Sequence, residues 1–295
     1  MDAQVLKIWL KLLRPHQYIK NTFVLIGILF SHHWDMLSIV QAAWAFCAFS
    51  ATASAVYVLN DIVDRNADRA HPTKCTRPLA SGAVSVQAAF KCLFGLLGFA
   101  FLPSMLAGQG WLVLILLIYL VMNIIYSFSW KHVVLVDVFA ISAGFMLRIL
   151  AGTVGLGIEP SEWLLLCSMM LTLFLGFSKR TSELLQSEAA GNFQQQTRKV
   201  LNEYSPVLLT QLTSITAACT TISYGLYTVA GTTVQIHGTN RLIYTLPFVI
   251  YGIFRYLYLT QRHAKGTDTA RDLLSDRHLL VTAVMWVACT FGILV

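Results

Sequence analysis

Long apolar stretches alternate with short polar connections along the whole chain. Nine stretches stand out, at about residues 18–32, 38–59, 83–105, 111–129, 132–154, 161–178, 207–230, 241–260 and 277–295. A helix needs about 20 apolar residues to cross a bilayer, and these stretches are too long and too continuously apolar to be strands of a membrane barrel. The pattern therefore predicts an all-α polytopic membrane protein with about nine transmembrane helices.

The composition supports this fold class. Hydrophobic residues make up 56% of the 295 residues, and charged residues only 12%, whereas soluble domains carry about 25% charged residues. We expect residues 1–295 to form a single transmembrane domain surrounded by membrane lipid. Residues 1–17 mix apolar side chains with Lys7, Lys11 and Arg14, which predicts an amphipathic helix on the membrane surface. No nucleic-acid partner is expected, and the sequence is compatible with either a monomer or a homo-oligomer.

Basic residues gather on one side of the predicted helices. The connections near 60–82, 178–206 and 261–276 carry most of them, as does the N-terminal segment, whereas those near 31–37, 106–110, 155–160 and 231–240 carry almost none. Loops rich in Lys and Arg stay in the cytoplasm. We therefore expect a protein of the cytoplasmic membrane, with its N-terminus and three long loops cytoplasmic and its C-terminus outside. Within the second loop, Gly191–Ser205 is expected to be exposed.

The first long loop opens with a dense cluster of acidic residues. It reads YVLNDIVDRNADRAHPTKCTRPLASG from Tyr57 to Gly82. Its aspartates follow i, i+3, i+7 spacing, and its asparagine and two of the aspartates recur every four residues, so that either set shares one face of a helix. The residues of these two sets are Asn60, Asp61, Asp64 and Asp68.

Carboxylates held this close repel one another unless a cation lies between them. Mg²⁺ prefers hard oxygen ligands and usually takes one or two carboxylates together with substrate phosphates. The basic residues that follow, Lys74 and Arg77, are suited to the remaining phosphate charge. The motif predicts a Mg²⁺–diphosphate site at the cytoplasmic face, and a solvated, salt-bridged loop is the alternative.

This motif resembles the first aspartate-rich motif, NDxxDxxxD, of the UbiA superfamily of intramembrane prenyltransferases. Within that superfamily, five segments resemble the decaprenyl-phosphate phosphoribosyltransferase branch, in order and along most of the chain. They are LRPHQYIKN (Leu13–Asn21), SAVYVLNDIVDRNADRAHPTK (Ser54–Lys74), YSFSWKH (Tyr126–His132), GFMLRILAG (Gly144–Gly152) and GFSKRTSEL (Gly176–Leu184).

The resemblance implies a UbiA-like fold and a specific reaction. The enzyme would transfer 5-phosphoribose from phosphoribosyl diphosphate to a polyprenyl phosphate, with Mg²⁺ as cofactor and diphosphate as the second product. The metal-binding and catalytic residues would be Asn60, Asp61, Asp64 and Asp68. The substrate-binding residues would be Arg14, Lys20, Asn21, Lys74, Arg77, Tyr126, Lys131, Lys179 and Arg180.

Two polar residues in the fifth apolar stretch have more than one possible role. Asp137 stands alone where aromatic prenyltransferases of the superfamily carry a second aspartate-rich motif, so it is either a weak metal site or a polar contact between helices. Arg148 has either a structural or cavity-lining role or a contact with substrate. Eleven helical residues separate them by about 16 Å, which argues against direct pairing.

Two other functions remain compatible with the sequence. An aromatic prenyltransferase would use a polyprenyl diphosphate donor and release diphosphate from an isoprenoid. A transporter would hold ionisable groups near the bilayer midplane, whereas the acidic motif here lies at the cytoplasmic end of a predicted span.

Overall fold

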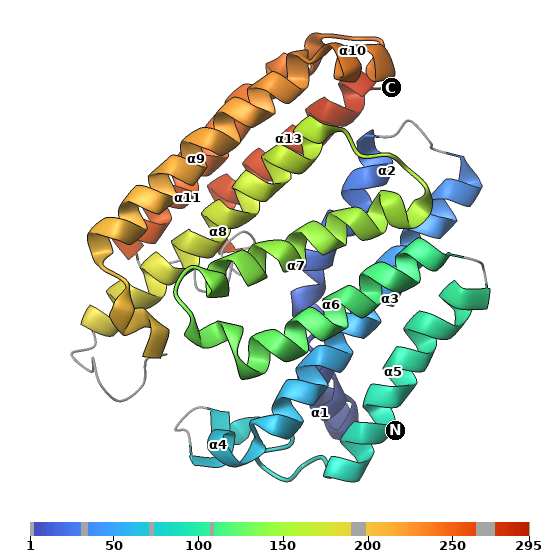
Figure 1. The fold of residues 1–295 in the computed structure, drawn as a ribbon, viewed down its shortest axis with the longest axis vertical. Helices are drawn as coiled ribbons and strands as arrows, with labels where there is room; N and C mark the ends of the chain where they lie inside the picture. The colour runs from blue at the N-terminus through green and yellow to red at the C-terminus, as the bar shows by residue number, and fades with distance from the viewer. Residues whose placement is uncertain are drawn as a thin grey trace. The chain divides into compact units, whose positions relative to one another are not determined.

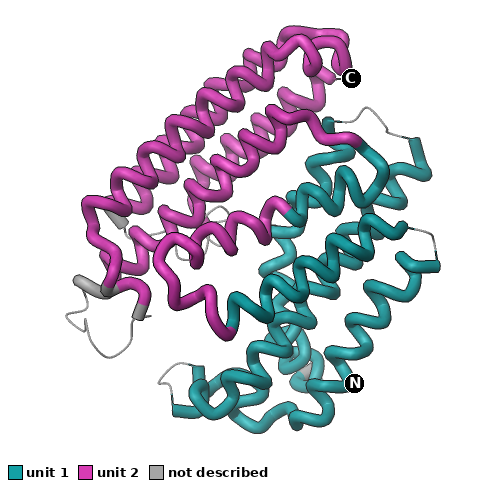
Figure 2. The backbone as a smooth tube through the Cα atoms, viewed as in Figure 1, with its two compact units in different colours: residues 1–127, 147–158 teal, residues 128–146, 159–295 magenta. Residues whose placement is uncertain are grey.

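The computed structural model describes residues 3–30, 35–70, 74–106, 109–189, 199–263 and 275–294. Within these ranges the regular structure is helical, without a strand (Figure 1). The chain forms two compact units (Figure 2). Unit 1 comprises Met1–Ser127 and Leu147–Ile158, and unit 2 comprises Phe128–Met146 and Glu159–Val295. A single domain over residues 1–295 stays a prediction.

Unit 1 contains the N-terminal helices, and η denotes a 3₁₀ helix. Its complete elements are α1 (Ala3–Leu13), η1 (Pro15–Leu25), α2 (Ile26–Phe30), α3 (Met36–Val63), α4 (Arg65–Ala70), η2 (Lys74–Thr76), α5 (Val86–Leu106) and η4 (Val154–Leu156). Unit 1 also contains α6 (Gly110–Phe128) except for its last residue, and the part of α7 (Val136–Gly152) that begins at Leu147.

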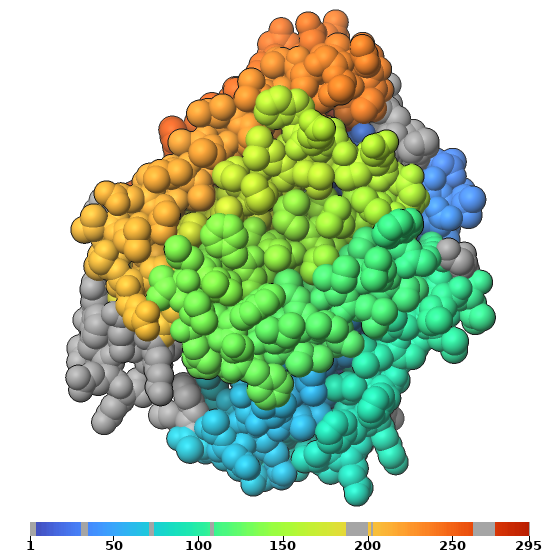
Figure 3. Space-filling model, in the orientation of Figure 1, coloured from blue at the N-terminus to red at the C-terminus, as the bar shows by residue number. Residues whose placement is uncertain are grey.

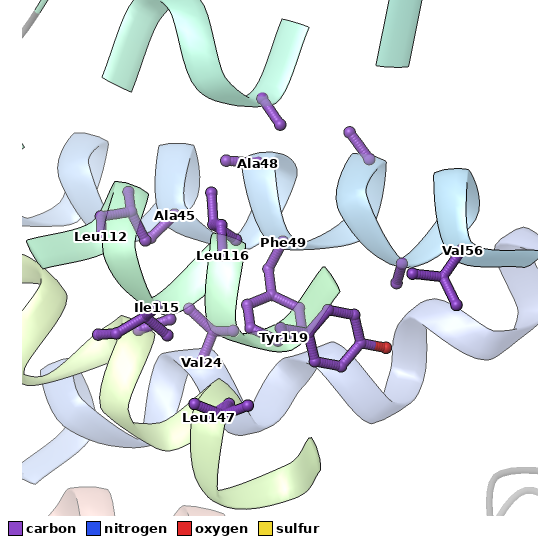
Figure 4. Packing of buried hydrophobic residues seen from close by; sticks show 14 residues of the cluster. Val24, Ala45, Ala48, Phe49, Val56, Leu112, Ile115, Leu116, Tyr119 and Leu147 are labelled. Carbon is purple, nitrogen blue, oxygen red and sulfur yellow. The ribbon is translucent and has the colours of Figure 1, made fainter. Parts of the chain in front are cut away.

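Small side chains place α3 at the centre of unit 1. Most of the residues in its middle turns are Ala, Ser or Thr, whose small side chains allow neighbouring helices to approach closely. In the most apolar part of α3, 67% of the residues are buried, against 22% in that of α5. Phe49 of α3 packs on Tyr119 of α6 with ring centroids 4.6 Å apart (Figure 4). The side chains of α5, drawn in teal, stand at the surface instead (Figure 3).

The first predicted span, at 18–32, is not a continuous α-helix. It consists of η1 and the short α2, which pack against the end of α7. A Cβ atom at Gly152 would lie 1.6 Å from the Val24 carbonyl oxygen, and one at Gly27 would lie 1.9 Å from the Gly152 carbonyl oxygen. Glycine at both positions therefore permits direct backbone contact between the two segments.

Unit 2 contains the remaining elements. They are η3 (Trp130–His132), the first part of α7, α8 (Glu162–Ala189), η5 (Lys199–Glu203), α9 (Pro206–Val229), α10 (Gly231–His237), η6 (Arg241–Thr245), α11 (Leu246–His263) and α13 (Arg277–Leu294).

Polar contacts connect helices within unit 2. Asp276 caps α13 by accepting a hydrogen bond from the Leu279 amide at 3.0 Å, and it also pairs with Arg255 of α11 at 2.8 Å. The bond from Arg255 lowers the pKa of Asp276 to about 2. Along α9, threonine hydroxyls bond to the carbonyl four residues earlier, as Thr213 does to Leu209 at 2.7 Å.

Seven helices in the described ranges are long and apolar enough to cross a membrane. They are Met36–Val63, Val86–Leu106, Gly110–Phe128, Val136–Leu156, Glu162–Gln186, Arg241–Gln261 and Arg277–Leu294. Each coincides with a predicted span. Helix α9 is where the 207–230 span was predicted, and its 24 residues extend about 36 Å. Its many Ser and Thr residues make it more polar, however, and it is not among the seven. The count of nine stays a prediction.

The predicted 178–206 loop is more ordered than expected. Helix α8 continues to Ala189, so that residues 178–189 are helical. The interpretation of Gly191–Ser205 as exposed is wrong for its last part, because Val200, Leu201 and Tyr204 are buried in a cluster with Val138 and other apolar residues. Residues 190–198 lie outside the described ranges, as do residues 264–274 of the predicted 261–276 loop.

Candidate active site

The acidic motif lies where α3 ends in unit 1. Asp64 follows α3 with φ −83° and ψ 2°, and α4 begins at the next residue. The Asp64 amide donates to the Asn60 carbonyl, and the Asp68 amide donates to the Asp64 carbonyl, each at 2.8 Å. These bonds preserve the helical spacing across the junction, so that Asn60, Asp64 and Asp68 follow one another by single turns.

Two arginines bind the buried carboxylates of the motif. Asp61 and Asp68 are 2% and 4% exposed. Arg14 Nη2 lies 2.7 Å from Asp61 Oδ1. Arg77 Nη1 lies 2.7 Å from Asp68 Oδ2 and 3.3 Å from Asp61 Oδ1. Burying a carboxylate requires such partners. Asp61 and Asp68 are therefore salt-bridged, as the alternative expected, but they are not solvated.

Three oxygen-bearing groups of the motif are incompletely bonded by the described residues. Asp61 Oδ2 is buried and accepts no hydrogen bond. No described residue donates to the Asp64 carboxylate, and the Asn60 amide has one partner in the described ranges, Ser127.

This donor set fits a magnesium–diphosphate group. Within the described ranges, no three His, Cys, Asp or Glu side chains converge on one point in a way that would hold a metal. Mg²⁺ bound with a diphosphate needs only one or two carboxylates, because phosphate oxygens and water complete its coordination. Asp61 Oδ2, Asp64 and Asn60 meet that requirement, and Asp68, which like Asp61 pairs with Arg77, stays a predicted ligand.

The segment around the acidic motif is held in place by side chain–backbone contacts. Lys11 Nζ donates to the Thr76 carbonyl at 2.6 Å, and Arg69 Nε donates to the Ala80 carbonyl at 3.0 Å. The guanidinium of Arg14 lies over the Tyr57 ring, 5.0 Å from its centroid. Helix α1 and the loop that carries Arg77 are therefore connected, while Lys74 is exposed.

Asn21, a predicted substrate-binding residue, is enclosed in a polar network of unit 1. Its side chain is 1% exposed, donates to Ser50 Oγ at 2.9 Å and accepts from Arg148 Nε at 2.8 Å. Arg148 also lies over the rings of Phe49 and Tyr119, about 5 Å from each centroid. Of the two roles open to Arg148, these contacts favour the structural one.

A second acidic group lies in unit 2. Asp137 is fully buried; its Oδ2 lies 2.5 Å from Arg180 Nε, and its Oδ1 accepts a hydrogen bond from the Tyr204 hydroxyl at 2.8 Å. Arg180, also fully buried, pairs with Glu183 as well. The Tyr204 hydroxyl in turn accepts from the Leu135 amide at 2.7 Å. Asp137 is therefore a polar contact between elements of unit 2, which was one of its two predicted roles.

The tyrosine of this group keeps its proton. Burial, together with the hydrogen bond to the Asp137 carboxylate, raises the pKa of Tyr204. Tyr204 therefore donates to Asp137 throughout the physiological pH range. The backbone that it supports at Leu135 has φ 66°, a left-handed conformation that is costly for leucine.

The other predicted substrate-binding residues are less enclosed. Lys20, Tyr126 and Lys131 are half-buried. Lys179 Nζ lies 3.9 Å from Glu183 Oε1, so that Lys179 and Arg180 share one glutamate. The structure thus groups Arg14 and Arg77 with the acids in unit 1, and Lys179 and Arg180 with Glu183 in unit 2.

Sequence reasoning missed Ser127 and Tyr204 as site residues. Ser127 lies inside the quoted segment YSFSWKH, so a signal for it was present. Tyr204 lies in a polar segment without periodicity, and its role depends on a contact with Asp137, 67 residues earlier.

Comparison with known proteins identifies the family. The sequence pattern of the UbiA prenyltransferase family matches residues 22–276. The chain belongs to this family. It is similar to the decaprenyl-phosphate phosphoribosyltransferase of Corynebacterium glutamicum, with 36% identity over 294 residues that cover 95% of this chain and 84% of that relative. The enzyme of the same name from Mycobacterium tuberculosis is 32% identical over 283 residues, covering 94% and 91%.

Solved structures confirm the UbiA fold. A UbiA homolog from Archaeoglobus fulgidus bound to GPP and Mg²⁺ superposes with a TM-score of 0.70 at 17% identity, covering 97% of this chain and 99% of that one. A digeranylgeranylglyceryl phosphate synthase structure gives 0.67 at 19% identity, covering 98% and 99%. The predicted all-α polytopic fold is confirmed, and this UbiA-family protein is a multi-pass membrane transferase rather than a transporter.

Proposed function

We propose that this UbiA-family enzyme transfers 5-phosphoribose from phosphoribosyl diphosphate to a polyprenyl phosphate and releases diphosphate. The observation that carries the proposal is the similarity, over almost the whole chain, to relatives named for this phosphoribosyl transfer. The pairing of Asp137 with Arg180 adds support, because it leaves the acids of unit 1 as the candidate metal–diphosphate site.

The acidic motif of unit 1 would receive the diphosphate of the donor. Asp61 Oδ2, Asp64 and Asn60 would hold Mg²⁺, which neutralises charge on the departing diphosphate when it is bound. Arg77 is positioned beside these acids, and its half-exposed guanidinium can turn from Asp61 towards a phosphate oxygen. Asp68 would keep Arg77 oriented while this happens.

The remaining phosphates would be bound by basic residues outside the motif. The donor carries a 5-phosphate and the acceptor a phosphate headgroup, and both need cationic partners. Lys20, Lys131 and Lys179 are candidates for these groups, with Lys74 sharing the diphosphate charge. The side chain of Arg180 is fully buried, so Arg180 would not contact a phosphate directly. It would affect substrate binding only through its ion pair with Glu183.

The reaction is a displacement at the anomeric carbon. The bond between C1 and the diphosphate oxygen breaks, and the diphosphate leaves with the electron pair, while an acceptor phosphate oxygen forms the new bond to C1. Because the acceptor oxygen is already anionic, no general base has to remove a proton. The contribution of the protein is positioning and electrostatic stabilisation.

The proposed location is the cytoplasmic membrane, with the acidic motif at the cytoplasmic face. The distribution of Lys and Arg supports this orientation. We expect a reporter fused after Val295 to be extracytoplasmic and one inserted within 185–200 to be cytoplasmic. Two reporters on the same side would contradict the topology and the placement of the site.

A reconstitution assay tests the function. Purified enzyme in detergent is incubated with radiolabelled phosphoribosyl diphosphate and decaprenyl phosphate, and label entering the lipid phase is measured together with released diphosphate. Label in the lipid that disappears with EDTA is the expected result. If the enzyme instead prenylates 4-hydroxybenzoate from a polyprenyl diphosphate and ignores phosphoribosyl diphosphate, the proposed donor is wrong.

A further inference from the structure

Ser127, near the end of α6, contacts the amide of the candidate ligand Asn60. Its Oγ lies 2.8 Å from Asn60 Oδ1 and also 2.8 Å from the carbonyl oxygen of Asn123, one turn earlier in α6. Both neighbours, as placed, are acceptors. A serine hydroxyl carries one proton, so it cannot donate a full hydrogen bond to both.

The backbone carbonyl is the fixed member of this pair. A peptide oxygen cannot change its identity, whereas the O and N atoms of an asparagine amide exchange positions by a half-turn and are assigned from the hydrogen-bond network. Bonding of a helical serine to the carbonyl four residues earlier is a common arrangement. With the Ser127 proton directed at Asn123, the amide atom that faces Ser127 has to be the donor, Nδ2.

Ser104 shows the same arrangement without ambiguity. It donates to the Ala100 carbonyl at 2.9 Å, one turn earlier in α5, and accepts the indole N–H of Trp44 at 3.0 Å. An indole nitrogen is only a donor. A serine in this unit therefore bonds to its own helix and accepts an N–H from a neighbouring helix at the same time.

We propose that Ser127 is a positioning residue that orients the Asn60 amide so that Oδ1, not Nδ2, faces the metal. The inference rests on the proposed metal site. With Nδ2 held by Ser127, Oδ1 points away from α6 as an available ligand, one helical turn from the Asp64 carboxylate, which no described residue binds. Without Ser127 the Asn60 amide samples both orientations. The orientation that directs its N–H groups at the cation weakens metal binding.

Metal affinity tests this proposal independently of turnover. Mn²⁺ binding to purified full-length protein is measured by electron paramagnetic resonance, as the loss of the free-ion signal. We expect Ser127→Ala to weaken Mn²⁺ binding about tenfold, the scale of changes in residues that orient metal ligands. Ser127→Thr, which keeps the hydroxyl, should bind like the wild type, and so should Ser104→Ala, which removes an equivalent hydroxyl elsewhere.

An aspartate at position 60 separates orientation from simple stability. A carboxylate presents an oxygen whichever way it is turned, so Ser127→Ala should cost no further Mn²⁺ affinity in an Asn60→Asp background. Equal losses in both backgrounds would overturn the proposal, as would wild-type affinity in Ser127→Ala. If the wild-type protein binds no Mn²⁺, the metal site and this inference both fail, whereas wild-type binding unaffected by Ser127→Ala removes the inference alone.

Discussion

Unit 1 and unit 2 each bury an aspartate against an arginine, but they complete the pairing differently. In unit 1, Asp61 shares Oδ1 between Arg14 and Arg77 and leaves Oδ2 without a hydrogen bond. In unit 2, both oxygens of Asp137 are bonded, one to Arg180 and one to Tyr204. The arginine side chains at Asp61 are 24% and 28% exposed, whereas that of Arg180 is fully enclosed.

This difference separates a group that can bind a ligand from one that supports the fold. An incomplete pairing with half-exposed arginines can accept a cation and release an arginine to a phosphate without exposing a new unpaired charge. A complete, enclosed pairing can do so only by leaving a buried charge without its partner, which costs several kcal/mol. The same two residue types therefore perform different tasks in the two units.

The largest expected effect is a loss of turnover when Asp64, whose carboxylate no described residue binds, is replaced. Asp64→Asn removes a negative ligand from the proposed metal site, and we expect phosphoribosyl transfer to fall about 10²- to 10³-fold. Thermal unfolding of the detergent-solubilised variant should match the wild type, because no described residue depends on this carboxylate. Near-normal turnover would show that the acids of unit 1 do not bind the metal.

Asp137→Ala should act on stability first. It leaves Arg180 buried with Glu183 as its remaining carboxylate partner, and we expect a loss of about 3 kcal/mol in the free energy of unfolding. Unfolding in mixed detergent micelles measures this loss. The double variant Asp137→Leu with Arg180→Met should recover much of it. If the Asp137→Ala variant is as stable as the wild type but no longer binds Mn²⁺, Asp137 is a metal ligand and not a structural residue.

Lys179→Ala tests whether unit 2 also binds substrate. A hydrogen bond to a charged group contributes about 1.5–3 kcal/mol, so the KM for phosphoribosyl diphosphate should rise about 10- to 100-fold. Exposed Lys91 of α5 offers a control, and Lys91→Ala should leave the KM unchanged. A ribose diphosphate that lacks the 5-phosphate should be indifferent to Lys179→Ala. If this analogue loses affinity as well, Lys179 binds another group.

The smallest effect is expected for Tyr204→Phe. The hydroxyl serves both Asp137 and the Leu135 amide, and its removal should lower the free energy of unfolding by about 1 kcal/mol, the net contribution of a typical hydrogen bond. The same unfolding measurement detects this change. A loss as large as that of Asp137→Ala would mean that Tyr204, rather than Arg180, is the principal partner of Asp137.

Much of the fold and part of the site could be predicted from local sequence. Continuous apolar stretches predicted seven helices of membrane-crossing length, since burial in lipid requires such stretches. The spacing of Asn60, Asp64 and Asp68 predicted their shared register, because that spacing depends only on helical geometry. The bent 18–32 segment could not be predicted, since its contact depends on Gly27 meeting Gly152, 125 residues later.

By itself, the sequence determined the membrane class, the positions of most helices, the acidic motif and the family, because each depends on residues close together in the chain. Only the tertiary structure decided which acids are paired. Arg14 reaches Asp61 across 47 residues, Arg180 reaches Asp137 across 43, and Ser127 reaches Asn60 across 67. A charge in the sequence has no fixed partner. Its partner is selected when distant helices pack and bury it, and that selection distinguishes the candidate metal site from the structural pair.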